Sequence, residues 1–368
     1  MKINLSRKDI EEFNKLLDVK DINLSIADLT LDYLENYKNN ICFDLFSSFE
    51  GLNKEKAFYY SLMDVMEIDL ENKENRYIGE KYILPGIRCL ETKEYEENPY
   101  VKNVKINLQH FKNLELKYLN YLPYEGFPFD DIRVDEDNYF KEITQLGFFE
   151  KPYQFLALLE NNKIWMSVNP NEIETMKKPI SNAKGDIVVF GLGMGYFAYM
   201  CSLKDDVKHI TIIENNQNII ELFNSKIFPL FEYKEKIKII KSDAFKFLKN
   251  MKSDDFTYGF VDLWHNPNDG IYAFLTFKSE ESRLQGLKFD YWLETGLLAL
   301  LRRCLITLID EEINGSTDEQ YHYQECETDK IINKSHFFLK NYSINNYKDI
   351  KKLLSEDSLK SLASNLYK

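Results

Sequence analysis

Between residues 183 and 262 the chain alternates short apolar runs with amphipathic stretches, and this alternation limits the folds open to it. Strands that alternate with helices form a mostly parallel sheet with flanking helices, because each crossover places a helix on one face. The sequence therefore predicts an α/β domain over residues 183–310. The predicted strands are Ile187–Phe190, Ile210–Ile213, Ile237–Ile240 and Tyr258–Val261, and the predicted helices are 196–203, 217–227 and 244–251.

The remaining segments are assigned from the periodicity of their apolar residues and from the prolines and turn residues that separate them. A chain of 368 residues is longer than a single hydrophobic core usually supports, so we expect further structural regions beside the sheet. Apolar positions at helical spacing predict a helical N-terminal region over residues 1–80. Residues 81–182 are predicted as a small β-containing region, with strands near Tyr82–Leu84 and Val104–Leu108. Leu287–Asp310 is predicted to be one long buried helix without a fifth strand, and 311–368 to be a helical C-terminal appendage that includes an amphipathic stretch at 347–366.

Composition excludes several classes of function. A net charge of −13 works against nucleic-acid binding, which depends on Lys and Arg displacing counterions. No apolar stretch is long enough to span a membrane and no signal core is present, so we expect a cytoplasmic protein. The acid-rich run at 121–140 matches no calcium loop and is predicted to be a solvated loop. The cysteines are scattered and are predicted to be reduced thiols without a metal site: Cys42, Cys89, Cys201, Cys304 and Cys326.

A glycine-rich turn follows the first predicted strand. Gly191-Leu192-Gly193-Met194-Gly195 separates that strand from a helix that begins near Tyr196. Glycines allow sharp backbone turns and close approach to a ligand, so a strand, a glycine turn and a helix are typical of nucleotide sites. A tight turn without a ligand is the alternative interpretation.

Carboxylates follow the next three predicted strands. Glu214 ends the second strand, nineteen residues beyond Gly195, Asp243 and Ala244 follow the third, and Asp262 follows the fourth. Ligands bind at the carboxyl ends of strands in open α/β sheets, and an acid at this distance from the glycines can accept ribose hydroxyls. The sequence thus favours a Rossmann-like nucleotide domain, with helix capping as the competing explanation for these acids.

With these motifs in place, residues 160–275 resemble class I S-adenosylmethionine-dependent methyltransferases, especially their spermidine-synthase-like branch. That branch also has an apolar residue where this chain has Val189, two positions before the first glycine. The resemblance implies S-adenosylmethionine, or a decarboxylated or demethylated relative, as cofactor. It places Glu214 on the ribose, Asp243 with Ala244 at the adenine, and Gly191, Gly193 and Gly195 around the methionine moiety.

The chain departs from the aminopropyltransferase pattern at the acceptor side. Those enzymes usually carry Asp-x-x-Asp-Pro after the fourth strand, whereas here Asp262 is followed by Asn266-Pro267 with one extra residue, and Glu174 stands near an expected tyrosine. We therefore expect methyl transfer to an unidentified small acceptor. The alternatives are aminopropyl transfer, a non-catalytic adenosine-metabolite-binding protein, and a NAD-dependent oxidoreductase, because residues 193–198 also fit G-x-G-x-x-A.

Four residues are candidates for chemistry on the acceptor. Asp262 and His265 are predicted to be catalytic, because a carboxylate or an imidazole can accept a proton from an attacking group. Trp264 and Glu172 are predicted to bind substrate, since an acidic surface and an indole suit a cationic acceptor. Packing and helix capping are the competing explanations, with Asn169 or Asn171 as the expected cap of the helix that contains Glu172. A homo-oligomer is compatible with the sequence.

Overall fold

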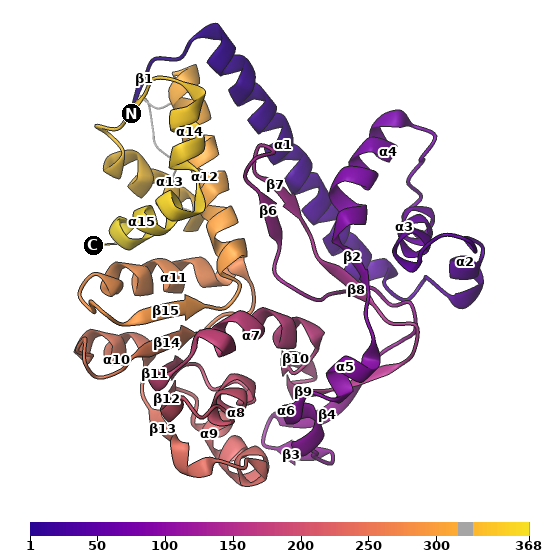
Figure 1. Ribbon diagram of the computed structural model, residues 1–368, viewed down its shortest axis with the longest axis vertical. Helices are drawn as coiled ribbons and strands as arrows, with labels where there is room; N and C mark the ends of the chain where they lie inside the picture. The colour runs from indigo at the N-terminus through magenta and orange to yellow at the C-terminus, as the bar shows by residue number, and fades with distance from the viewer. Residues whose placement is uncertain (316–326, 368) are drawn as a thin grey trace.

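The computed structural model describes residues 1–315 and 327–367, and its centre is a five-stranded parallel sheet (Figure 1). The strand order is β13-β12-β11-β14-β15, with the first strand of the unit, β11, in the middle. The four predicted strands are confirmed, each within a few residues of its expected bounds. They are β11 (Gly185–Phe190), β12 (Val207–Glu214), β13 (Ile237–Lys241) and β14 (Tyr258–Val261).

Both faces of this sheet are covered by helices, as strands buried on two sides require. Successive side chains of a strand point to opposite faces. Accordingly Ile187 and Val189 of β11 belong to one core cluster, whereas Val188 and Phe190 belong to another. The first cluster includes α7 (Pro170–Asn182), α8 (Tyr196–Ser202) and α9 (Gln217–Leu222), which continues as η4 (Phe223–Ile227). The second includes α10 (Ala244–Asn250), α11 (Pro267–Glu281) and α12 (Glu294–Asn314).

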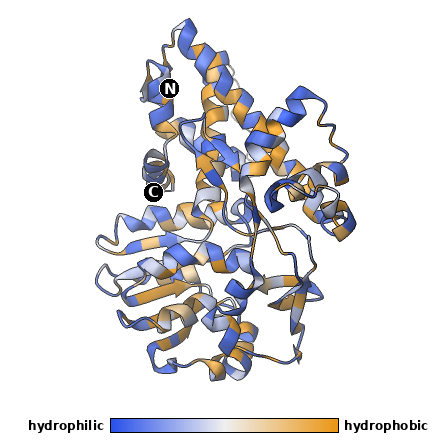
Figure 2. Ribbon diagram, turned by 45° about the vertical axis from the view of Figure 1, so that its right-hand side comes forward, coloured by the Kyte–Doolittle hydropathy of each residue, from blue (hydrophilic) through white to orange (hydrophobic). Residues whose placement is uncertain are grey.

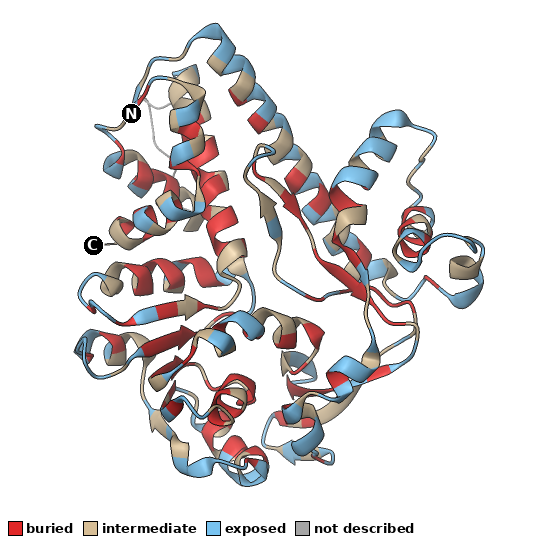
Figure 3. Ribbon diagram, in the orientation of Figure 1, coloured by how far each residue is buried: buried red, intermediate tan, exposed pale blue. Residues whose placement is uncertain are grey.

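The expectation of one helix from Leu287 to Asp310, without a fifth strand, is wrong. Lys288–Tyr291 forms β15, which pairs in parallel with β14, and only then does α12 begin at Glu294. This strand was hard to detect because it has four residues at the sheet edge and alternates polar with apolar side chains. Helix α12 is buried along most of its length (Figure 3). It ends at Asn314, past the predicted domain boundary at 310.

Helices dominate the first 80 residues. The long helix α1 (Arg7–Asp32) has both hydrophobic and hydrophilic residues along its length (Figure 2), and its Phe13 and Leu16 are buried. The run at Tyr82–Leu84 is not a strand, since it forms helical turns ahead of Pro85. The elements of this part are η1 (Tyr33–Tyr37), α2 (Phe43–Ser47), α3 (Lys54–Val65), α4 (Lys73–Ile78), η2 (Gly79–Ile83) and η3 (Leu84–Gly86).

A second, antiparallel sheet with the order β10-β9-β4-β3 lies beside the helices of the first core cluster. Its strands are β3 (Gln109–Phe111), β4 (Leu114–Tyr121), β9 (Tyr153–Glu160) and β10 (Lys163–Ser167). The predicted strand at Val104–Leu108 is instead irregular backbone between α6 (Pro99–Asn103) and β3, with α5 (Thr92–Glu96) just before it. Short strands complete this region: β2 (Ile87–Cys89), β5 (Phe127–Pro128), β6 (Arg133–Asp135), β7 (Lys141–Ile143) and β8 (Leu146–Phe148).

The acid-rich run at 121–140 is not the solvated loop that its composition predicts. Glu125 is buried, accepts a hydrogen bond from the Leu122 amide and pairs with Lys38. Asp131 accepts hydrogen bonds from the amides of Thr295 and Gly296 at the start of α12. These acids therefore tie the segment to the rest of the fold.

The C-terminal stretch packs against helices that cover the parallel sheet. Its elements are α13 (Glu327–Phe338), β16 (Ser343–Ile344), α14 (Tyr347–Leu353) and α15 (Glu356–Leu366), and α15 packs on α11 and α12. Strand β16 pairs with β1 (Lys2–Ile3), so the N-terminal strand is held against the C-terminal part of the chain. Cys326 lies outside the described residues. Within residues 1–315 and 327–367 no helix is long and apolar enough to cross a membrane.

Candidate functional site

The glycine turn leaves the carboxyl end of β11 in a conformation that demands glycine. Gly191, Gly193 and Gly195 all have positive φ, at 101°, 53° and 74°. Backbone in this region is strained for residues with a β-carbon. A β-carbon on Gly191 would overlap the carbonyl oxygen of Asp262, whereas one on Gly193 would meet open space. The turn thus packs directly against the segment that follows β14.

Glu214 lies at the end of β12, beside this turn. Its Oε2 accepts a hydrogen bond from the Leu192 amide at 3.1 Å, and its Oε1 accepts one from the Asn216 amide at 2.7 Å. The carboxylate is half-buried and each oxygen has a second lone pair, so it can still accept two hydroxyl groups. This geometry suits the ribose role that the resemblance implies.

Asp243 lies at the end of β13 and caps helix α10. Its Oδ1 accepts a hydrogen bond from the Lys246 amide at 2.9 Å. The capping interpretation of this acid is therefore correct, although its second oxygen accepts no hydrogen bond within the described part of the chain. Ala244 is the first residue of α10 and contacts the core cluster on that face of the sheet.

Glu172 and Asp262 meet at a small cavity beneath the glycine turn. The cavity has a volume of about 10 Å³, roughly the room for one water. Glu172 comes from the first turn of α7, which Asn169 caps, and Asp262 follows β14. Neither carboxylate accepts a hydrogen bond or pairs with a cation among the described residues. The cavity is lined by Glu172, Met176, Val189, Gly191, Leu192, Gly193, Met194, Tyr196, Phe197, Ala198, Ile212, Phe260 and Asp262.

These two acids resist ionisation. Burial raises the pKa of Asp262 to about 7. Burial, and then the negative charge of Asp262, raise the pKa of Glu172 well above its ordinary value. Carboxylates that lose water without gaining a cation or a hydrogen-bond donor behave in this way. Such a pair attracts a cationic ligand, and a carboxyl that titrates near neutral pH can act as a general base.

Two tyrosines that the sequence gave no reason to select complete the surroundings. Tyr100 of α6 donates a hydrogen bond from its hydroxyl to the carbonyl of Met194 in the glycine turn, at 2.7 Å. Tyr196 lines the cavity, and its hydroxyl accepts a hydrogen bond from Asn98 at 3.0 Å. Burial raises the pKa of both phenols, and the charge of Glu172 adds to the effect. Tyr100 is far from the glycine turn in the sequence, so no local pattern could have indicated it. Tyr196 directly follows the turn, and that position is the one signal that could have identified it.

The other two acceptor-side candidates, Trp264 and His265, make contacts within the protein that explain their positions without a ligand. Trp264 is 6% exposed, donates its indole N–H to the Trp292 carbonyl at 3.1 Å, and packs on Gly270. This arrangement favours packing over stacking on an acceptor. His265 is exposed, and its Nδ1 lies 3.0 Å from the carboxylate of Asp269. Its hydrogen bonds are therefore with the first turn of α11, as the local interpretation predicts.

Comparison with solved structures finds limited similarity to two spermidine synthase structures. The spermidine synthase from Thermotoga maritima is 12% identical with a TM-score of 0.29, and the match covers 41% of this chain and 58% of that one. A spermidine synthase in complex with the transition-state analogue AdoDATO is 14% identical, also with a TM-score of 0.29, over 39% of this chain and 57% of that one. The chain thus spans less than two thirds of either structure. No protein-family model and no curated protein matches it.

Proposed function

We propose that this chain binds an S-adenosyl nucleoside at the carboxyl edge of a Rossmann-like sheet and transfers an aminopropyl group from it to an amine. The single observation that carries this proposal is the pair Glu172 and Asp262 beside the glycine turn, unpaired among the described residues. Glu214 supports it, because its carboxylate is placed at the end of the adjoining strand with acceptor capacity to spare. The cavity holds about one water as it stands, so binding requires the surrounding side chains to part.

The lining of this cavity favours aminopropyl transfer over the methyl transfer that the sequence suggested. S-Adenosylmethionine carries a sulfonium, an ammonium and a carboxylate, whereas its decarboxylated relative carries only the two cations. None of the described residues that line the cavity is Lys or Arg, and two are acids. A ligand carboxylate there would meet like charge without a compensating cation, which is costly in a poorly solvated site. The dicationic donor avoids that cost.

The transfer uses a base and needs no metal. The neutral nitrogen of the acceptor amine attacks the aminopropyl carbon next to the sulfonium sulfur. The carbon–nitrogen bond forms as the carbon–sulfur bond breaks, and the electron pair of the broken bond stays on sulfur, which leaves methylthioadenosine. Before this attack the protonated acceptor gives one proton to Asp262, whose pKa near 7 suits a base at neutral pH, and the product keeps its positive charge as a secondary ammonium. Alignment of amine and donor supplies the rest of the acceleration.

Calorimetry of the purified chain tests this proposal directly. We expect decarboxylated S-adenosylmethionine and methylthioadenosine to bind at micromolar concentration, S-adenosylmethionine at least tenfold more weakly, and NAD not at all. Glu172→Gln should reduce the preference for the decarboxylated compound, because it removes a carboxyl group that can ionise when a cationic ligand binds beside it. Failure of every S-adenosyl compound to bind would reject the nucleoside site. Tighter binding of S-adenosylmethionine than of its decarboxylated relative would restore methyl transfer.

A further inference from the structure

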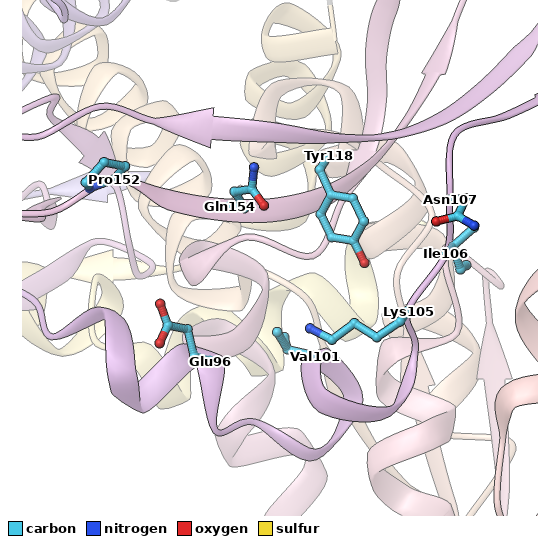
Figure 4. Close-up of a pocket in the computed structure, with 8 residues that line it drawn as sticks. All are labelled: Glu96, Val101, Lys105, Ile106, Asn107, Tyr118, Pro152 and Gln154. Atoms are coloured by element: carbon cyan, nitrogen blue, oxygen red, sulfur yellow. The ribbon is translucent and has the colours of Figure 1, made fainter.

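A groove larger than the cavity at the glycine turn lies on the other side of α6. It has a volume of about 460 Å³, within the range typical of small-molecule sites. Its floor comes from α5, α6 and the irregular residues that follow them, and its opposite wall comes from β4 and β9 (Figure 4). The lining residues are Glu96, Val101, Lys105, Ile106, Asn107, Tyr118, Pro152 and Gln154.

Four polar side chains of this groove are unpaired within the described residues. Glu96 and Lys105 lie on its floor on either side of Val101, and Tyr118 and Gln154 lie on the opposite wall (Figure 4). No ion pair or side-chain hydrogen bond involves any of these four polar residues in the described parts of the chain. By contrast, the nearby Lys93, Lys112 and Lys117 each pair with a glutamate.

We propose that this groove binds a small zwitterion of the amino-acid class, with its carboxylate at Lys105 and its ammonium group at Glu96. One cation and one anion that are not paired with each other match a ligand that carries both charges. The amides of Asn107 and Gln154 and the phenol of Tyr118 can bond an uncharged polar part of the ligand. A nucleotide or phosphate ester fits less well, because Glu96 would oppose the single lysine.

The groove is connected to the glycine turn through α6. Val101, Tyr118 and Gln154 also line a smaller adjoining cavity, which reaches Tyr100. Tyr100 in turn donates its hydroxyl hydrogen bond to Met194 of the turn. A ligand that contacts Val101 would therefore lie against the same helix whose Tyr100 holds the turn.

Saturation-transfer NMR on the whole chain tests this site without any nucleoside. The probes are glutamine and 4-aminobutyrate, and butylamine and butyrate serve as analogues with only one charge. We expect the two zwitterions to bind at least fivefold more tightly than either analogue. Lys105→Met and Glu96→Gln should each weaken zwitterion binding at least fivefold. Both side chains are exposed, so neither substitution threatens the fold.

Lys102→Met and Glu94→Gln provide controls, because both residues are exposed, on α6 and α5 respectively, but do not line the groove. Their zwitterion binding should stay within twofold of the wild type. Equal binding of the zwitterions and the single-charge analogues would overturn the proposal. So would unchanged zwitterion binding in both groove variants, or no zwitterion binding to the wild type. None of these results depends on whether the glycine turn binds a nucleoside.

Discussion

Ionisation of Glu172 is made unfavourable first by its burial and then by the carboxylate of Asp262, which lines the same small cavity. The two acids come from different parts of the chain, since α7 precedes the central strand and Asp262 follows the fourth strand. Both side chains are half-buried, and two such acids without a paired cation are unfavourable because both lose hydration and repel each other. We attribute the arrangement to a cationic ligand, and the predictions below separate its effects on stability, binding and turnover.

The first prediction concerns stability against pH. The pKa of Asp262 is raised from 3.8 to about 7, so between these values the folded chain binds more protons than the unfolded chain. Raising the pH through this window therefore lowers the free energy of unfolding, by on the order of 2–4 kcal/mol from this site. Asp262→Asn should remove that loss and should be more stable than the wild type at pH 8. Urea unfolding at pH 5 and pH 8 measures it.

Asp254→Asn is the control for this measurement, because Asp254 is exposed on the loop before β14. Its unfolding free energy should follow the wild type at both pH values. A wild type and an Asp262→Asn variant with the same dependence on pH would contradict the raised pKa.

The second prediction compares two glycines of one turn. Gly191→Ala must adopt a φ of 101° and also displace the Asp262 carbonyl, whereas Gly193→Ala meets only the unfavourable φ of 53°. We expect losses of roughly 2–4 kcal/mol for Gly191→Ala and about 1 kcal/mol for Gly193→Ala, since backbone strain and steric overlap add. Thermal unfolding ranks the two. A smaller loss for Gly191→Ala would show that the turn does not pack on the segment after β14.

The third prediction tests the ribose role of Glu214. Glu214→Gln keeps an oxygen for the Leu192 amide but loses the charge, so the turn should survive while nucleoside affinity falls. Charge-assisted hydrogen bonds contribute about 1.5–3 kcal/mol, which corresponds to at least a tenfold rise in the Kd for methylthioadenosine. Calorimetry gives the constant. Glu235→Gln, an exposed acid just before β13, should leave the Kd unchanged, and an equal Kd in both variants would reject the assignment.

The fourth prediction separates turnover from binding at Asp262. With an amine acceptor identified, Asp262→Asn should lose roughly 10²–10⁴ in kcat, the usual contribution of a general base. Its Kd for methylthioadenosine should change less than tenfold. Release of methylthioadenosine under saturating substrates measures kcat. The rate should recover partly at high pH, where the acceptor amine is already neutral. Unchanged kcat would leave Asp262 without a catalytic role.

Local patterns along the chain were sufficient to predict the centre of the fold. Four apolar runs became four parallel strands, and the glycine turn formed where predicted, because buried strands and positive-φ turns impose strong demands on nearby residues. The edge strand Lys288–Tyr291 escaped prediction, since a half-exposed strand of four residues resembles the start of an amphipathic helix. The runs at Tyr82–Leu84 and Val104–Leu108 were predicted as strands but are not strands, because apolar residues can also be buried from helical turns and irregular backbone.

The sequence alone determined which residues end the strands, and hence that Glu214, Asp243 and Asp262 share one edge of the sheet with the glycines. The cap that Asp243 forms is a local contact with the Lys246 amide, and the sequence already offered it as an explanation. The surroundings of Trp264, Glu172 and Asp262 depend on distant segments: tertiary packing buried Trp264 and brought Glu172 to Asp262, with no cation paired to either acid among the described residues. Electrostatic pairing acts through space over a few ångströms, whereas a sequence pattern reports only distance along the chain.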